Sequence, residues 1–174
     1  MVTLLLFLLL QVPTEVIRYW EDYTETEKQQ VLSSSTVPNI VRCVYQNSFH
    51  PSDDDKTEKV LEILSEKQND DNLRALYFYL FNSTFIHSDG ALSEMVSAYC
   101  FKMVLNNPDY ALSYFQDHSN IMNWYSEMIG FDIGVQRNPD DCFDRFKTII
   151  SKRKDPTTKC FLHKVEATIE SCRE

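Results

Sequence analysis

Apolar residues recur every three or four positions along most of the chain, which is the spacing of one face of an α-helix. In the segment 91–105, for example, Val96, Cys100 and Met103 fall on one side of a helix. No segment is predicted as a strand. The pattern predicts helices over residues 14–33, 38–48, 54–67, 72–86, 91–105, 139–152 and 156–172.

The segment 72–86 is apolar on nearly all sides and contains Phe78, Phe81 and Phe85. Aromatic side chains also suit a β-strand, but the length of the segment and the helical pattern on both sides favour a helix. A helix that is apolar all round must be buried. We therefore expect this helix at the centre of the fold.

Proline and glycine indicate where helices begin and where they are interrupted. Proline is well tolerated at the first position of a helix, where its missing N–H would have no partner. Each proline precedes an apolar-periodic segment and is predicted at a helix start: Pro13, Pro38, Pro51, Pro108, Pro139 and Pro156. Three of them follow residues that can cap a helix, namely Asn107, Asn138 and Asp155. Gly130 and Gly134 are expected to mark a looser stretch.

The tripeptides Asn107-Pro108-Asp109 and Asn138-Pro139-Asp140 lie 31 residues apart and are each followed by apolar residues at matching positions. This offset is close to the length of one helical hairpin in repeat proteins. The sequence thus predicts an all-α fold of about seven to nine helices. It is either an irregular helical bundle or a short α-solenoid-like array of helices.

The chain of 174 residues fits one domain, and residues 13–174 are predicted to form a single all-helical domain. Residues 2–10 are an uninterrupted apolar run, about half as long as a transmembrane span, so no transmembrane span is expected. Residues 1–12 are either a signal peptide or its remnant, or an apolar N-terminal segment. No Lys or Arg precedes the run and no small-x-small cleavage site follows it. Export, to the periplasm or the medium, and a cytoplasmic location both stay open.

The cysteines do not decide between these locations. Their spacing contains no C-x-x-C pair, which argues against a structural zinc site. A free cysteine on an apolar helical face behaves as a small hydrophobic residue. An exported chain would instead be expected to form one or two disulfides, and a bond among Cys142, Cys160 and Cys172 is favoured. The five cysteines are Cys43, Cys100, Cys142, Cys160 and Cys172.

The net charge is −9, and it is unevenly distributed: residues 1–136 carry −11 and residues 137–174 carry +2. Nucleic-acid binding requires a basic face, so nucleic acid is not an expected partner. The basic stretch 152–154 follows a predicted helix end and is explained by the helix dipole. We expect an acidic face that binds a basic protein partner.

No nucleotide-binding, metalloprotease or nucleophile-elbow motif is present, and neither a metal nor a cofactor is expected. The weak catalytic candidates are His87, Asp89 and His118, which with Ser88 could form a hydrolytic site between helices. A simpler interpretation is that Ser88 or Asp89 caps the helix that begins near Gly90.

The remaining features also have structural explanations. Asn82-Ser83-Thr84 matches a glycosylation sequon, but it falls in the most apolar predicted helix, which is a poor acceptor position. The many aromatic residues could line a ligand cavity, yet they are more simply explained as core. The sequence therefore favours a non-enzymatic helical protein-interaction module with an acidic face. The alternatives are a hydrolase with an interhelical site and a carrier of an apolar ligand.

Overall fold

The computed structural model describes residues 17–173, and within them the fold is all-α, as the apolar spacing predicts. Residues 1–12, for which a signal peptide or an apolar segment is predicted, lie outside the described part. One short 3-10 helix, η1 (Trp20–Asp22), precedes the α-helices. The nine α-helices of this part are α1 (Glu25–Ser33), α2 (Asn39–Tyr45), α3 (Asp55–Ser65), α4 (Asp71–Phe85), α5 (Gly90–Asn106), α6 (Pro108–Asp117), α7 (Ser119–Gly134), α8 (Pro139–Ile150) and α9 (Pro156–Ser171).

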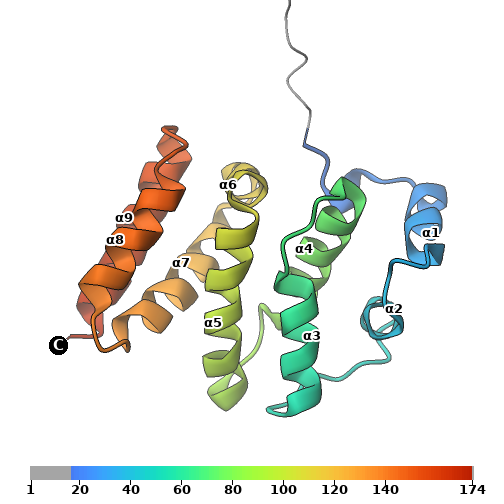
Figure 1. The fold of residues 1–174 in the computed structure, drawn as a ribbon, viewed down its shortest axis with the longest axis horizontal. Coiled ribbons are helices and arrows are strands. Elements are labelled where there is room, and N and C mark those ends of the chain that lie inside the picture. The colour runs from blue at the N-terminus through green and yellow to red at the C-terminus, as the bar shows by residue number, and fades with distance from the viewer. Residues whose placement is uncertain (1–16, 174) are drawn as a thin grey trace, which may run out of the picture.

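The helices follow one another along the long axis, from α1 and α2 at one end to α8 and α9 at the other (Figure 1). One row is formed by α3, α5 and α8, because α5 packs on both of the others. A second row is formed by α4, α7 and α9, with Phe78 and Phe81 of α4 stacked on Tyr125 of α7. α6 closes one end against α5, α7 and α9. The described part is thus an all-α bundle whose nine helices agree with the predicted seven to nine.

The apolar segment 72–86 forms α4, and the prediction that this helix is central is confirmed. Eight of its fifteen residues are buried, among them Phe78, Phe81 and Phe85. Asp70 begins the helix by accepting bonds from the backbone N–H groups of Asn72 and Leu73. α4 contributes to the buried apolar cluster of the described region. In residues 17–173, neither α4 nor any other helix has the length and apolar character required to span a bilayer.

Proline marks three helix starts correctly: Pro108, Pro139 and Pro156 are the first residues of α6, α8 and α9. Asp155 caps α9 through a bond from the backbone N–H of Thr158 at 2.9 Å. Pro38 directly precedes α2 as its N-cap residue. Pro51 is a wrong prediction, because it lies in the loop before α3. Pro13 lies outside the described residues.

Other capping groups replace the expected ones. The side chain of Asp54, three residues after Pro51, caps α3. Asn107 and Asn138 stand at helix starts but make no capping bond with their side chains. The backbone φ angle is −136° at Asn107 and −131° at Asn138.

The prediction of a looser stretch at Gly130 and Gly134 is wrong. Both residues belong to α7, on the face that packs against α9. A Cβ atom at Gly130 would lie 2.4 Å from the Cβ of Thr168, and one at Gly134 would lie 2.9 Å from the Cβ of Cys172. The glycines are therefore required for the close approach of two parallel helices.

The basic stretch 152–154 follows the end of α8, as expected for cations near a helix C-terminus. Arg153 has a further role that charge alone does not predict. Its guanidinium donates to the Ser113 hydroxyl at 2.6 Å and to the Asp109 carbonyl at 3.1 Å, both on α6. It also pairs with Asp155 at the start of α9. Arg153 thus joins the α8–α9 connection to α6.

Candidate functional site

The candidate residues His87 and Asp89 lie in the connection between α4 and α5, and both are exposed. Asp89 is the N-cap residue of α5, but its side chain makes no capping bond. The Ser88 hydroxyl donates instead to the carbonyl of Phe85 at 2.8 Å. Neither Ser88 nor Asp89 therefore caps the helix with its side chain. The sharp turn is made by Gly90, whose φ of +54° is accessible to glycine at little cost.

His118 occupies a different environment, between α6 and α7. Its ring stacks on that of Tyr114, with centroids 3.9 Å apart, and its Nδ1 lies 2.9 Å from the Tyr114 carbonyl oxygen. The ring of Tyr19 approaches His118 edge-on. His118 is thus held by the aromatic side chains that join the N-terminal segment to α6.

The structure does not bring His118 to the other two candidates. Ser93, in the first turn of α5, contacts Met128 of α7 through an Oγ–Sδ distance of 3.8 Å. His118 precedes Met128 by ten residues, or about 15 Å along α7 at 1.5 Å per residue. In Figure 1 the α4–α5 connection lies at the lower end of α5, whereas α6 lies at its upper end. The three side chains therefore do not form one site.

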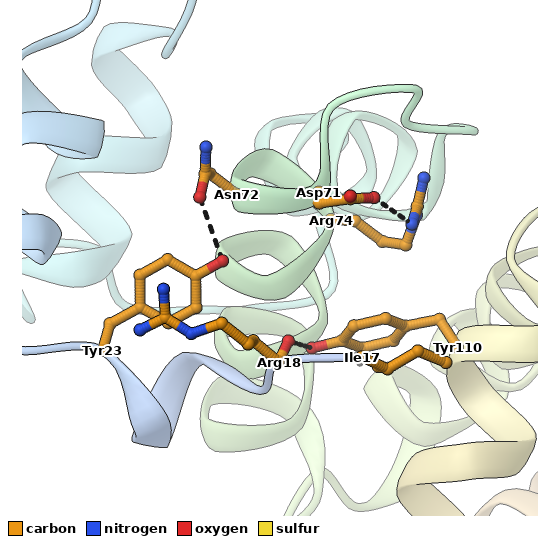
Figure 2. Close-up of a pocket in the computed structure, with 7 residues that line it drawn as sticks. All are labelled: Ile17, Arg18, Tyr23, Asp71, Asn72, Arg74 and Tyr110. Atoms are coloured by element: carbon orange, nitrogen blue, oxygen red, sulfur yellow. Dashed lines mark hydrogen bonds and ion pairs between the residues drawn. The ribbon is translucent and has the colours of Figure 1, made fainter. Parts of the chain in front are cut away.

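A pocket of about 300 Å³ lies where the N-terminal segment meets the start of α4 and Tyr110 of α6. Figure 2 shows the polar contacts that close it. The guanidinium of Arg18 lies 4.2 Å above the centre of the Tyr23 ring, and the Tyr23 hydroxyl donates to Asn72 at 3.0 Å. The buried Tyr110 donates its hydroxyl to the Arg18 carbonyl at 3.3 Å. The pocket is therefore also the seam that attaches residues 17–23 to the helices.

The charged groups of this pocket already have partners. Arg74 pairs with Asp71 at 2.6 Å and donates to the carbonyl of Gln68. Arg18 forms a two-pronged ion pair with Glu27 at 3.1 and 3.2 Å. The seven lining residues include no imidazole, thiol or aliphatic hydroxyl. The arrangement suits attachment and binding, and it supplies no nucleophile with a neighbouring base.

The carboxyl of Glu27 has a pKa lowered to about 2, first by the bond from Arg18 and then by bonds from Thr24. The Thr24 backbone N–H donates to Glu27 at 2.8 Å, and the Glu27 N–H donates back to the Thr24 hydroxyl at 3.3 Å. This reciprocal pair is a capping box at the start of α1. The ionised form of Glu27 is thus the one that the fold stabilises.

We expect the stabilisation by Glu27 to disappear in acid. Because its pKa is lowered on folding, its contribution is fully present above a pH of about 4.5 and is lost as the pH falls towards about 2. Urea unfolding of the wild type and Glu27→Gln, measured across this range, should give free energies of unfolding that converge at low pH. In an Arg18→Gln background the convergence should occur at higher pH, because the main cause of the shift is removed. A wild-type advantage that is independent of pH would contradict this assignment.

A buried polar pair lies inside the aromatic core. The Tyr125 hydroxyl donates to the Oδ1 of Asn82 at 2.9 Å, and burial raises the pKa of Tyr125. The Nδ2 of Asn82 is buried and has no hydrogen-bond partner among the described residues. The side chain of Asn82 faces the core and only 6% of the residue is exposed, so the structure agrees with the expectation that this sequon is a poor acceptor.

The aromatic residues proposed as a cavity lining pack against one another. Phe115 contacts the rings of Tyr125 and Phe161 at centroid distances of 5.0 and 5.1 Å. Phe101 stacks on Phe146 at 5.2 Å.

All five cysteines are free, so the disulfides considered among Cys142, Cys160 and Cys172 are not formed. Within residues 17–173, no group of three or more His, Cys, Asp or Glu side chains is placed to hold a metal ion.

The exposed face of α3 separates its charges into two halves. The half nearer α5 carries Asp55, Glu58 and Glu62, and Glu66 follows as the C-cap residue of the helix. The Tyr99 hydroxyl of α5 donates to Glu58 at 3.3 Å. Partial burial, together with the charge of Glu58, raises the pKa of Tyr99 to about 12. No ion pair involves these four carboxylates in the described part of the chain. We call this half the acidic stripe.

The other half of the exposed α3 face is basic. It carries Lys56 and Lys59. The Lys56 ammonium lies 5.4 Å from the centre of the Phe49 ring, which is in the α2–α3 connection. The two halves thus face different neighbours.

Comparison with known protein families, with curated protein sequences and with solved structures finds no match to this chain.

Proposed function

We propose that this chain is a non-enzymatic protein-interaction module that binds a basic partner through the acidic stripe of α3. The observation that supports the proposal is the segregation of charge on one exposed helix. Asp55, Glu58 and Glu62 are separated by three or four residues and are therefore neighbours on the helix surface, and Glu66 adds a carboxylate at the C-cap. Like charges in this arrangement repel one another, and a basic partner would relieve that repulsion.

The surroundings of the stripe support the same interpretation. The basic half of α3 lies on the side away from α5, where Lys56 contacts the Phe49 ring. A patch of one sign accelerates encounter with a partner of the opposite sign, and the association weakens as salt screens the charges. Of the candidate catalytic residues, His118 lies far from His87 and Asp89, so the three do not form one site.

The proposal predicts a salt-sensitive complex that depends on the carboxylates of α3. The immobilised chain would be exposed to lysate of its native source at about 50 mM and about 300 mM salt, where the Debye length differs more than two-fold. Glu58→Gln/Glu62→Gln keeps side-chain size and should reduce recovery of the partner about ten-fold at low salt. The matched variant Lys56→Gln/Lys59→Gln, on the same helix, should bind at least as well as the wild type.

The recovered protein should carry a basic surface, and its binding should weaken at the higher salt concentration. The proposal fails if every recovered protein binds the Glu and Lys variants equally, or if no protein is recovered at low salt. Circular dichroism of each variant would verify that α3 is retained, since all four substituted residues are exposed.

A further inference from the structure

A second surface lies on the side of α5 away from the acidic stripe, in the groove between α5 and α8. Its floor is apolar and is formed by Phe101 and Leu105 of α5 and by Cys142, Phe146 and Ile149 of α8. The volume of this groove is about 530 Å³. Ile149 is 37% exposed although the next residue, Ile150, is buried. A large apolar side chain is thus presented to solvent where the groove is open.

The groove continues beyond Leu105 and Ile149 into a second depression of about 530 Å³, because both residues line both spaces. This second part is bordered by the α3–α4 connection, the start of α6 and the residues that follow α8. Together the two parts form a longer trough, which we call the α5–α8 groove.

The α5–α8 groove is basic on balance, in contrast to the net charge of −9 of the chain, because five cations and two carboxylates, Asp109 and Asp141, line it. Arg137, Lys67 and Lys152 are exposed on its rim, and none of them takes part in an ion pair with another described residue. Arg145 is also present but is paired with Asp141 at 2.7 Å. Two of the three unpaired cations come from residues 137–174, the part of the sequence whose net charge is positive.

We propose that the α5–α8 groove is a docking site for an acidic amphipathic helix of a partner protein. Apolar side chains of such a helix, at every third or fourth position, would cover the partly exposed floor formed by Phe101, Leu105 and Ile149. Its flanking Asp and Glu side chains would meet Lys67, Arg137 and Lys152. A basic helix would bring like charges together at the same rim, which is unfavourable. The site is independent of the acidic stripe and selects a partner of the opposite charge.

The test uses two synthetic helical peptides with the same leucine positions, one with glutamate and one with lysine on the flanks. Fluorescence anisotropy should show that the full chain binds the glutamate peptide at least about ten-fold more tightly than the lysine peptide. Lys67→Glu/Lys152→Glu should weaken binding of the glutamate peptide about ten-fold. The control Lys56→Glu/Lys59→Glu makes the same change in net charge on α3 and should alter the affinity less than about two-fold.

The apolar floor is tested separately with Ile149→Gln. This variant should bind the glutamate peptide more weakly, while the salt dependence of binding stays unchanged. Equal affinity for the two peptides, no measurable binding of either, or equal effects of both lysine pairs would overturn the proposal. The last measurement is the oligomeric state of the chain alone, by sedimentation. A dimer that Lys67→Glu/Lys152→Glu dissolves would show that a second copy occupies the groove, and the proposal of a separate partner would fail.

Discussion

Phe78→Ala should lower the free energy of unfolding by about 3–5 kcal/mol, the range for removing a fully buried aromatic ring. Phe78 is 1% exposed and lies at the junction of three helices. Its ring contacts those of Tyr110, Tyr114 and Tyr125 at centroid distances of 5.3, 5.0 and 5.8 Å. Each such aromatic pair is worth roughly 0.5–1.5 kcal/mol beyond the burial of its area. The variant loses these contacts and leaves a cavity that rigid neighbouring rings fill poorly.

Phe131→Ala is the matched control, because it removes the same ring from a position that is 40% exposed. Phe131→Ala should lower the free energy of unfolding by less than about 1 kcal/mol. Phe78→Leu fills most of the space and should fall between the two variants. Urea unfolding monitored by far-UV circular dichroism would rank all three. Equal losses for Phe78→Ala and Phe131→Ala would show that α4 is not the centre of the cooperative core.

The helices of the fold could be predicted because their causes are local. The apolar spacing of 72–86 requires burial on several sides, and α4 has that position. Pro108 and Pro139 mark the starts of α6 and α8, each the second helix of a pair in chain order. The 31-residue offset between them thus corresponds to equivalent places in α5–α6 and α7–α8.

The surfaces could not be predicted in the same way, because they depend on how distant helices are oriented. Ile149 and Ile150 are identical neighbours on the same apolar stripe, yet one is 37% exposed and the other 1%. Their side chains point about 100° apart around α8, and the packing of α8 against its neighbours decides which of the two is covered. The candidate His118 shows the same limit, since its stacking on Tyr114 depends on the geometry of the α6–α7 junction. The positive charge of residues 137–174 was the one signal of a basic surface, and it does not locate the groove.

Glycine has two opposite structural roles in this chain, and the sequence alone does not distinguish them. Gly90 has a positive φ and open space around it, so it serves a turn. Gly130 and Gly134 are helical and face α9 at short distance. Their spacing of four residues places both on one side of α7. Glycine usually destabilises a helix. In α7, however, Gly130 and Gly134 allow α7 and α9 to approach each other closely.

Gly130→Ala should therefore destabilise the fold by about 1–3 kcal/mol, the usual cost of overpacking. In an unobstructed helix the same change would stabilise by up to about 1 kcal/mol, because alanine is the better helix former. At Gly130 the new methyl group would lie 2.4 Å from the Thr168 Cβ and 2.9 Å from the Val165 carbonyl oxygen, so α9 must move. Gly134→Ala should cost less, because its nearest neighbour is Cys172, the C-cap residue at the end of α9.

The double variant Gly130→Ala/Thr168→Gly isolates the cause, since it removes the nearer of the two obstacles and keeps the alanine. The two changes should compensate each other, giving a coupling energy of about 1 kcal/mol or more in a double-mutant cycle by urea unfolding. The Val165 carbonyl still lies close, so recovery should be partial. Additive effects, or a Gly130→Ala variant as stable as the wild type, would mean that α7 and α9 are farther apart in solution than this packing requires.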